Sequence, residues 1–73
     1  MIILMPDETF GKNVHDPRRR KRISLARFAA LTAIPYLTLY CIENGTLRDI
    51  HHDHVCAICK TLRTTQEKLM GKL

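Results

Sequence analysis

The sequence predicts a single all-α domain of four to five short helices behind an extended N-terminal arm. At 73 residues, the chain has room for only one small core. Capping and turn residues divide the chain from residue 16 onward into short segments with helical spacing of apolar side chains. One face of the clearest such helix carries Leu25, Phe28, Ala29 and Thr32.

Residues 1–16 lack a helical period, and their Gly, Pro and Asn residues favour an extended or partly disordered arm. MIILMP fits a short strand, and its apolar tip is expected to pack on the body or on a second subunit. Asp16 and Pro17 predict the first helix, with Asp16 as N-cap and Pro17 at the first helical position. This helix ends near residue 22 or continues into the next one. The domain proper is therefore expected to span 17–73.

Residues 24–45 predict two short helices separated by a tight turn. Ser24 offers a helix start, Ala33 lies at the turn, and Ile34 follows it as an apolar plug. Pro35 suits the first turn of the second helix, where its missing N–H is not needed. In that helix the inward positions are Leu39 and Ile42, and Gly45 supplies the stop.

The remaining residues predict a loop over 46–50, a helix over 51–62 and a last helix over 66–73. Thr64 or Thr65 caps the last helix, and Leu69 anchors it. The inner face of the longer helix is expected to carry Val55, Ile58, Cys59 and Leu62.

The pattern SLARFAALTAIPYLTLYCIENG, together with the closing pattern from Leu62 to Leu69, resembles the Cro/C1 (Xre-type) helix-turn-helix family over residues 18–70. The resemblance implies a lambda-repressor-like fold, with Gly common at the position of Ala33 because the backbone there has a positive φ. The residues to which it gives a structural role are Phe28, Ala29, Ile34, Leu39, Ile42, Glu43 and Gly45.

In this family the second motif helix reads DNA bases, so the resemblance implies a small DNA-binding transcriptional regulator of phage or mobile-element origin. A DNA binder of this type is expected to dimerise on palindromic half-sites. Of the candidate contacts, only Asn44 carries an amide suited to bidentate base recognition. Leu25 stands where the family often has a phosphate-gripping Gln. By position, the DNA- or partner-binding residues are Tyr36, Leu37, Tyr40, Cys41 and Asn44.

The net charge of +5 is concentrated just before the motif. Residues 18–22 carry five cations, whereas the preceding residues carry Lys12 against three acids. Such a run is suited to phosphate binding through counterion release, although a solvated basic segment is the simpler alternative. The expected phosphate contacts are Arg18, Arg19, Arg20, Lys21, Arg22, Arg27 and Arg48.

Two alternatives stay open for the second motif helix. Its exposed apolar residues are of the kind that marks a protein interface, so the module can instead be an antirepressor that binds a repressor protein. Alternatively, Tyr36 or Leu37 packs beneath the N-terminal arm as ordinary core.

The family resemblance also implies an ion pair for Glu43, because the equivalent acid in the family often pairs with an arginine of the first helix. Arg18 is the first candidate partner, with Arg19 or Arg22 as alternatives. A solvent-exposed Glu near a helix end is the simpler alternative.

A cluster of residue types that bind zinc follows the loop, namely His51, His52, Asp53, His54, Cys56 and Cys59. It lacks a second ligand pair at a suitable spacing, so we expect exposed histidines, a buried Cys59 and no metal or other cofactor. Three cysteines without a secretory signal indicate reduced thiols in the cytoplasm, and the short apolar opening predicts no membrane span. No catalytic constellation is visible, so an enzyme is not expected.

Overall fold

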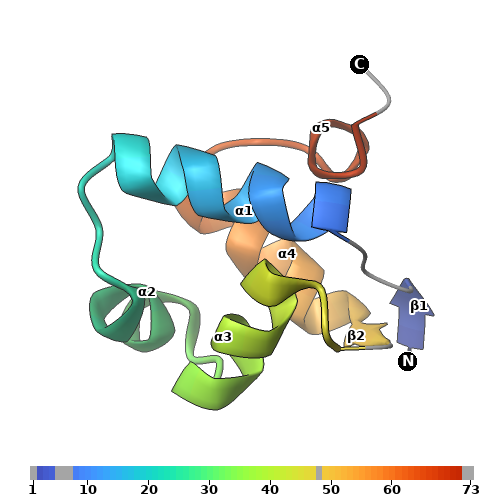
Figure 1. Cartoon of the computed structure of the whole chain (residues 1–73), viewed down its shortest axis with the longest axis horizontal. Helices are drawn as coiled ribbons and strands as arrows, with labels where there is room; N and C mark the ends of the chain where they lie inside the picture. Colours follow the sequence, from blue (N-terminus) through green and yellow to red (C-terminus); the bar gives the residue numbers. More distant parts are fainter. Residues whose placement is uncertain (1, 5–7, 48, 72–73) are drawn as a thin grey trace.

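The computed structural model describes residues 2–4, 8–47 and 49–71, and it confirms the predicted all-α class (Figure 1). A short β-pair accompanies the helices. The elements in chain order are β1 (Ile2–Leu4), α1 (Glu8–Arg20), α2 (Leu25–Thr32), α3 (Tyr36–Asn44), β2 (Ile50–His51), α4 (His52–Leu62) and α5 (Gln66–Leu69).

The helices enclose one core, with α4 lying behind α1 and α3 in the view of Figure 1. α1 packs against α3 and α5, and α4 packs against α2. Every described helix contributes at least one buried apolar side chain. The core consists of Phe10, Val14, Phe28, Ile34, Leu39, Ile42, Ile50, Val55, Ile58, Leu62 and Leu69. Cys59, expected inside, is only half-buried.

The predicted extended arm over residues 1–16 is wrong for residues 8–16, which form the first turns of α1. Tertiary packing overrides the weak local propensity here, because Phe10, Val14 and Arg18 lie four residues apart and form one buried stripe. Asp16 is therefore no N-cap, Pro17 lies inside the helix, and α1 crosses the expected domain boundary.

Gly11 allows α1 to approach α3 closely. A Cβ placed on this glycine would lie 2.5 Å from the carbonyl oxygen of Glu43 and 2.6 Å from that of Ile42. The residue that argued for a loop in the sequence is thus the residue that the α1–α3 contact requires.

The short strand expected in MIILMP is present as β1. Its partner is β2 of the same chain, with Ile2 opposite His51 and Leu4 opposite Ile50 in an antiparallel pair. β2 falls at the junction of the expected 46–50 loop and the following helix, and Ile50 is buried there.

The helix-turn-helix matches the sequence prediction closely. The Ser24 Oγ accepts a hydrogen bond from the Arg27 N–H at 3.1 Å and caps α2. Ala33 has φ 58°, and the buried Ile34 follows it. Pro35 is the N-cap residue of α3, one position earlier than expected, and Gly45 ends α3 with φ 71°. Across this three-residue turn the chain bends by 114° between α2 and α3, within the range of known helix-turn-helix units.

A buried ion pair joins α1 to α3, as predicted for Arg18 and Glu43. Arg18 Nε donates to Glu43 Oε2 at 2.7 Å, and Nη2 donates to Oε1 at 2.9 Å. Each of the two side chains is only 7% exposed. The remaining Arg18 nitrogen, Nη1, donates to the carbonyl of Ile23 at 2.7 Å. His15 Nδ1 lies 2.8 Å from Glu43 Oε1.

Glu43→Ala leaves the Arg18 charge buried without its partner, which typically costs about 3–5 kcal/mol. We expect a melting temperature at least about 10 °C lower, measured by circular dichroism. Because apolar replacement of both partners removes the stranded charge, the double variant Arg18→Met/Glu43→Leu should cost less than the two single variants added together. Asp49→Ala, at an exposed acid, is the control. An unchanged melting temperature for Glu43→Ala contradicts this role.

Gly11→Ala should destabilise the fold by about 1–3 kcal/mol, because the added methyl group meets the α3 backbone. The sign of this change in the free energy of unfolding distinguishes a close contact from an open helix, because Gly→Ala inside an unobstructed helix stabilises by about 1 kcal/mol. Thr9→Ala, at an exposed position of α1, controls for helix propensity. Urea unfolding measures both variants, and a Gly11→Ala protein as stable as the parent would show that α1 does not approach α3 this closely.

Candidate functional site

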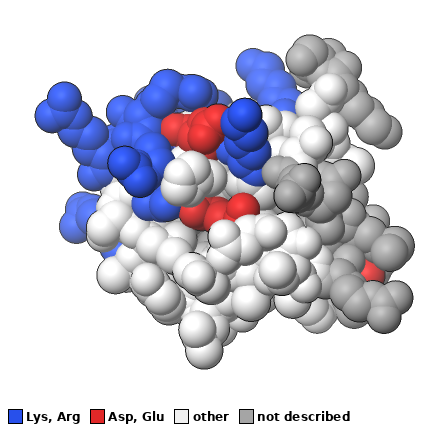
Figure 2. All heavy atoms as spheres, in the orientation of Figure 1, with Lys and Arg blue, Asp and Glu red and all other residues white. Residues whose placement is uncertain are grey.

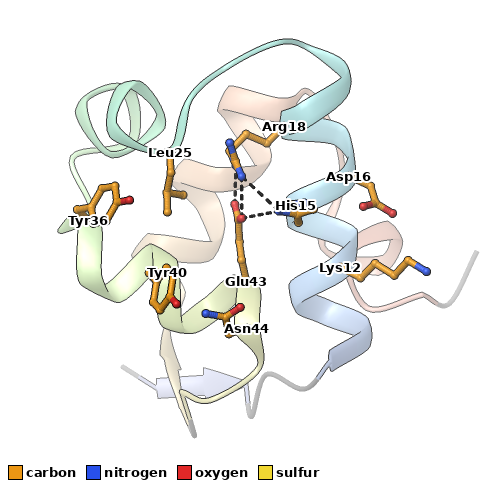
Figure 3. A pocket seen from close by; sticks show the side chains of 9 residues that line it. All are labelled: Lys12, His15, Asp16, Arg18, Leu25, Tyr36, Tyr40, Glu43 and Asn44. Atoms are coloured by element: carbon orange, nitrogen blue, oxygen red, sulfur yellow. Dashed lines mark hydrogen bonds and ion pairs between the residues drawn. The ribbon is translucent and has the colours of Figure 1, made fainter.

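A groove of about 660 Å³ lies on the surface where α1 and α3 meet (Figure 3). The Arg18–Glu43 ion pair lies at the centre of its lining, and Leu25, at the start of α2, lies beside it. Lining residues on the α1 side include Lys12, His15 and Asp16. Those on the α3 side include Tyr36, Tyr40 and Asn44. The ion pair thus fixes the distance between the two walls.

The outer surface of α3 presents two rows of side chains, because residues four apart lie above one another on a helix. One row consists of Tyr36, Tyr40 and Asn44 and borders the groove. The second row consists of Leu37 and Cys41. We call these five residues the α3 face.

The α3 face is accessible, so the packing of Tyr36 or Leu37 as ordinary core does not occur. Leu37 is 73% exposed, Tyr40 is 53% exposed and Tyr36 is 49% exposed. Asn44 is exposed, whereas Cys41 is half-buried. Leu37 is therefore the main apolar contact that this face offers to a partner.

The α3 face is also uncharged. Residues 28–42 contain no acidic or basic side chain. In Figure 2 the surface over α3 is mostly white, red acidic atoms lie along its upper edge, and Lys and Arg side chains gather beyond them, around the end of α1 and beside α2. The molecule therefore combines an apolar surface with a basic border.

The basic run does not act as one unit, because a helix directs successive side chains about 100° apart. Arg18 points inward and is buried in the ion pair. The prediction that Arg18 contacts phosphate is therefore wrong. By helical position, Arg19 lies on the side of α1 that carries Lys12, His15 and Asp16, and its side chain is exposed. Arg20 and Lys21 line a separate hollow beside α5, together with Arg63 and Lys68.

Two further exposed cations lie between the end of α1 and the first turn of α2. Arg22, in the turn after α1, has the left-handed conformation with φ 58°, and its N–H donates to the Arg19 carbonyl at 3.0 Å. This turn leaves the Arg22 side chain exposed, as is that of Arg27 in the first turn of α2. Arg48, the last expected phosphate contact, lies outside the described residues.

Residues 51–59 do not assemble a metal centre within the described part of the chain, where no group of three or more His, Cys, Asp or Glu side chains converges. Cys56 Sγ lies 3.4 Å from His52 Nε2, one helical turn away. Burial, with lesser effects of Cys56 and Glu67, raises the pKa of the Cys59 thiol. The thiol form is therefore favoured at neutral pH, and only the thiolate binds metal well.

Among the described residues, no single helix has the length and apolar character needed to cross a membrane. α2 and α3 meet that criterion only when taken together, and they are bent by 114°.

The sequence does not predict the α1 wall of the groove. It places Lys12, His15 and Asp16 in an arm or at a helix start, whereas in the structure they line the groove opposite α3. The four-residue spacing of Phe10, Val14 and Arg18 is the signal that reveals this helix.

No family model and no curated protein matches the sequence. Among solved structures, the fold matches that of the restriction-modification controller protein C.AhdI from Aeromonas hydrophila. The TM-score is 0.77 at 19% sequence identity, and the match covers 85% of this chain and 92% of that one. At this identity the match establishes a shared fold, and it confirms the predicted all-α helix-turn-helix architecture.

Proposed function

We propose that the protein is a DNA-binding transcriptional regulator that places α3 in the major groove. The observations that carry this proposal are the exposed, uncharged α3 face and the exposed cations Arg19, Arg22 and Arg27 between the end of α1 and the first turn of α2. A major groove admits an α-helix, and cations beside such a helix meet the phosphates that flank the groove. The shared fold with a protein named as a controller supports the regulatory part of the proposal.

In this arrangement affinity and sequence reading come from different residues. The three arginines neutralise phosphates and position the protein on the duplex. Base reading falls to the α3 face, in which Tyr36 and Tyr40 each carry one hydroxyl group and Asn44 carries an amide. Arg20 and Lys21 lie on the side of α5 and contribute little to this contact.

We propose further that the protein binds as a homodimer, because one short helix in one groove contacts few bases and paired half-sites are the usual solution. Membership of the Cro/C1 family and a phage or mobile-element origin stay predictions of the sequence resemblance.

The exposed Leu37 and Tyr40 also favour a second candidate function, an antirepressor that docks the α3 face on a repressor protein. Charge argues against it. The DNA-contacting surface of a repressor is basic, and the cations around the α3 face would repel it. Double-stranded DNA is the better electrostatic match.

We expect a random-sequence 20-bp duplex to bind with a Kd that rises steeply with salt, measured by fluorescence anisotropy between about 50 and 200 mM salt. Arg19→Ala/Arg27→Ala should flatten the slope of log K against log[salt] by about 2, since each lost phosphate contact removes about 0.9.

Arg20→Ala/Lys21→Ala is the matched control, because it removes the same charge on the side of α5. Its slope should stay close to that of the parent. Equal flattening by the two double variants would contradict the proposed orientation. Absence of binding at low salt would reject DNA as the partner and favour the docking alternative.

A further inference from the structure

We propose that the α3 face recognises the C5 methyl groups of thymine, so that the protein prefers A·T base pairs through an apolar contact of Leu37. This inference rests on the proposed DNA binding and specifies which DNA chemistry the same face reads.

The first argument is the absence of the usual base-reading groups. The commonest specific contact in the major groove is a bidentate Arg or Lys to guanine. Residues 28–42 contain no cation, so no described side chain in the first half of α3 can make it. The most exposed large hydrophobic side chain of the helix is instead Leu37, at 73%.

The second argument is what an apolar side chain finds in the major groove. The thymine C5 methyl group is the apolar group on base edges there, whereas G·C pairs present only N7, O6 and N4 polar atoms. Leu37 placed over a G·C pair would strip water from those atoms and return no hydrogen bond. An A·T pair also presents polar atoms, namely adenine N7 and N6 and thymine O4, but over a thymine the same side chain gains the burial of a methyl group that a G·C pair lacks.

The third argument comes from the neighbouring row of the α3 face. Asn44 is exposed and carries the amide that pairs with adenine N6 and N7. Adenine is the base opposite thymine. Asn44 in one row and Leu37 in the other therefore favour the same type of base pair, A·T.

Because the contact is to a methyl group rather than to a base as such, 5-methylcytosine should replace thymine in part. It carries the same C5 methyl group in the major groove. Deoxyuridine should fail to replace thymine, although it pairs identically.

The test uses four 20-bp duplexes: alternating dA·dT, the same duplex with deoxyuridine for thymidine, alternating dG·dC, and dG·dC with 5-methylcytosine. An alternating duplex presents equivalent edges in every register, so no operator sequence is needed. Loss of one methyl contact should weaken binding about fourfold. We therefore expect a fourfold or greater rise in Kd from thymidine to deoxyuridine, and a fall in Kd on cytosine methylation.

The variant Leu37→Ala should remove most of the difference in Kd between thymidine and deoxyuridine and most of that between cytosine and 5-methylcytosine. It should keep the salt slope of the parent. Leu31→Ala is the matched control, because Leu31 is an exposed leucine of α2 outside the α3 face. It should keep both differences.

Equal affinity for the thymidine and deoxyuridine duplexes would overturn methyl recognition while leaving salt-dependent DNA binding intact. A methyl effect that persists unchanged in Leu37→Ala would overturn the role of Leu37. Failure of all four duplexes to bind at low salt would overturn this inference together with the proposed function.

Discussion

The Arg18–Glu43 ion pair is the contact on which the rest of the structure depends. It joins α1 to α3 across the groove, and each of the three guanidinium nitrogens of Arg18 has an acceptor. Two charges out of water are tolerated only when their hydrogen bonds are satisfied in this way. Gly11 allows the same two helices to meet at the other end of the contact. α3 is therefore held from one side, and its opposite side stays open.

How much of the fold the sequence predicts depends on whether local or long-range contacts decide each element. Residues 24–45 are predictable almost residue by residue, because Ser24, Ala33 and Gly45 act on their immediate neighbours. The first helix is not, because Gly11 and Pro17 oppose helix locally and only burial against α3 and α5 offsets their cost. β2 escapes prediction for the same reason, since its partner lies in residues 2–4.

In the candidate site, too, some features can be predicted from the sequence and others depend on long-range packing. The residues of the α3 face come from the family resemblance by position, and four of the five are exposed while Cys41 is half-buried. The roles within the basic run do not follow, because they depend on where α1 begins and on which side of it packs. With the start at Glu8, Arg18 becomes buried, Arg19 stays exposed, and Arg20 and Lys21 turn toward α5. A charge count without this geometry overstates the cations available beside α3.

The central claim is that DNA contacts the α3 face and its basic border. Backbone amide NMR during titration with a random-sequence 20-bp duplex at low salt tests it most directly. We expect chemical-shift changes concentrated at residues 19–27 and 36–44, with the amide signals of α4 and α5 largely unchanged. Shifts confined to the side of Lys21, Arg63 and Lys68, with α3 unmoved, would contradict it.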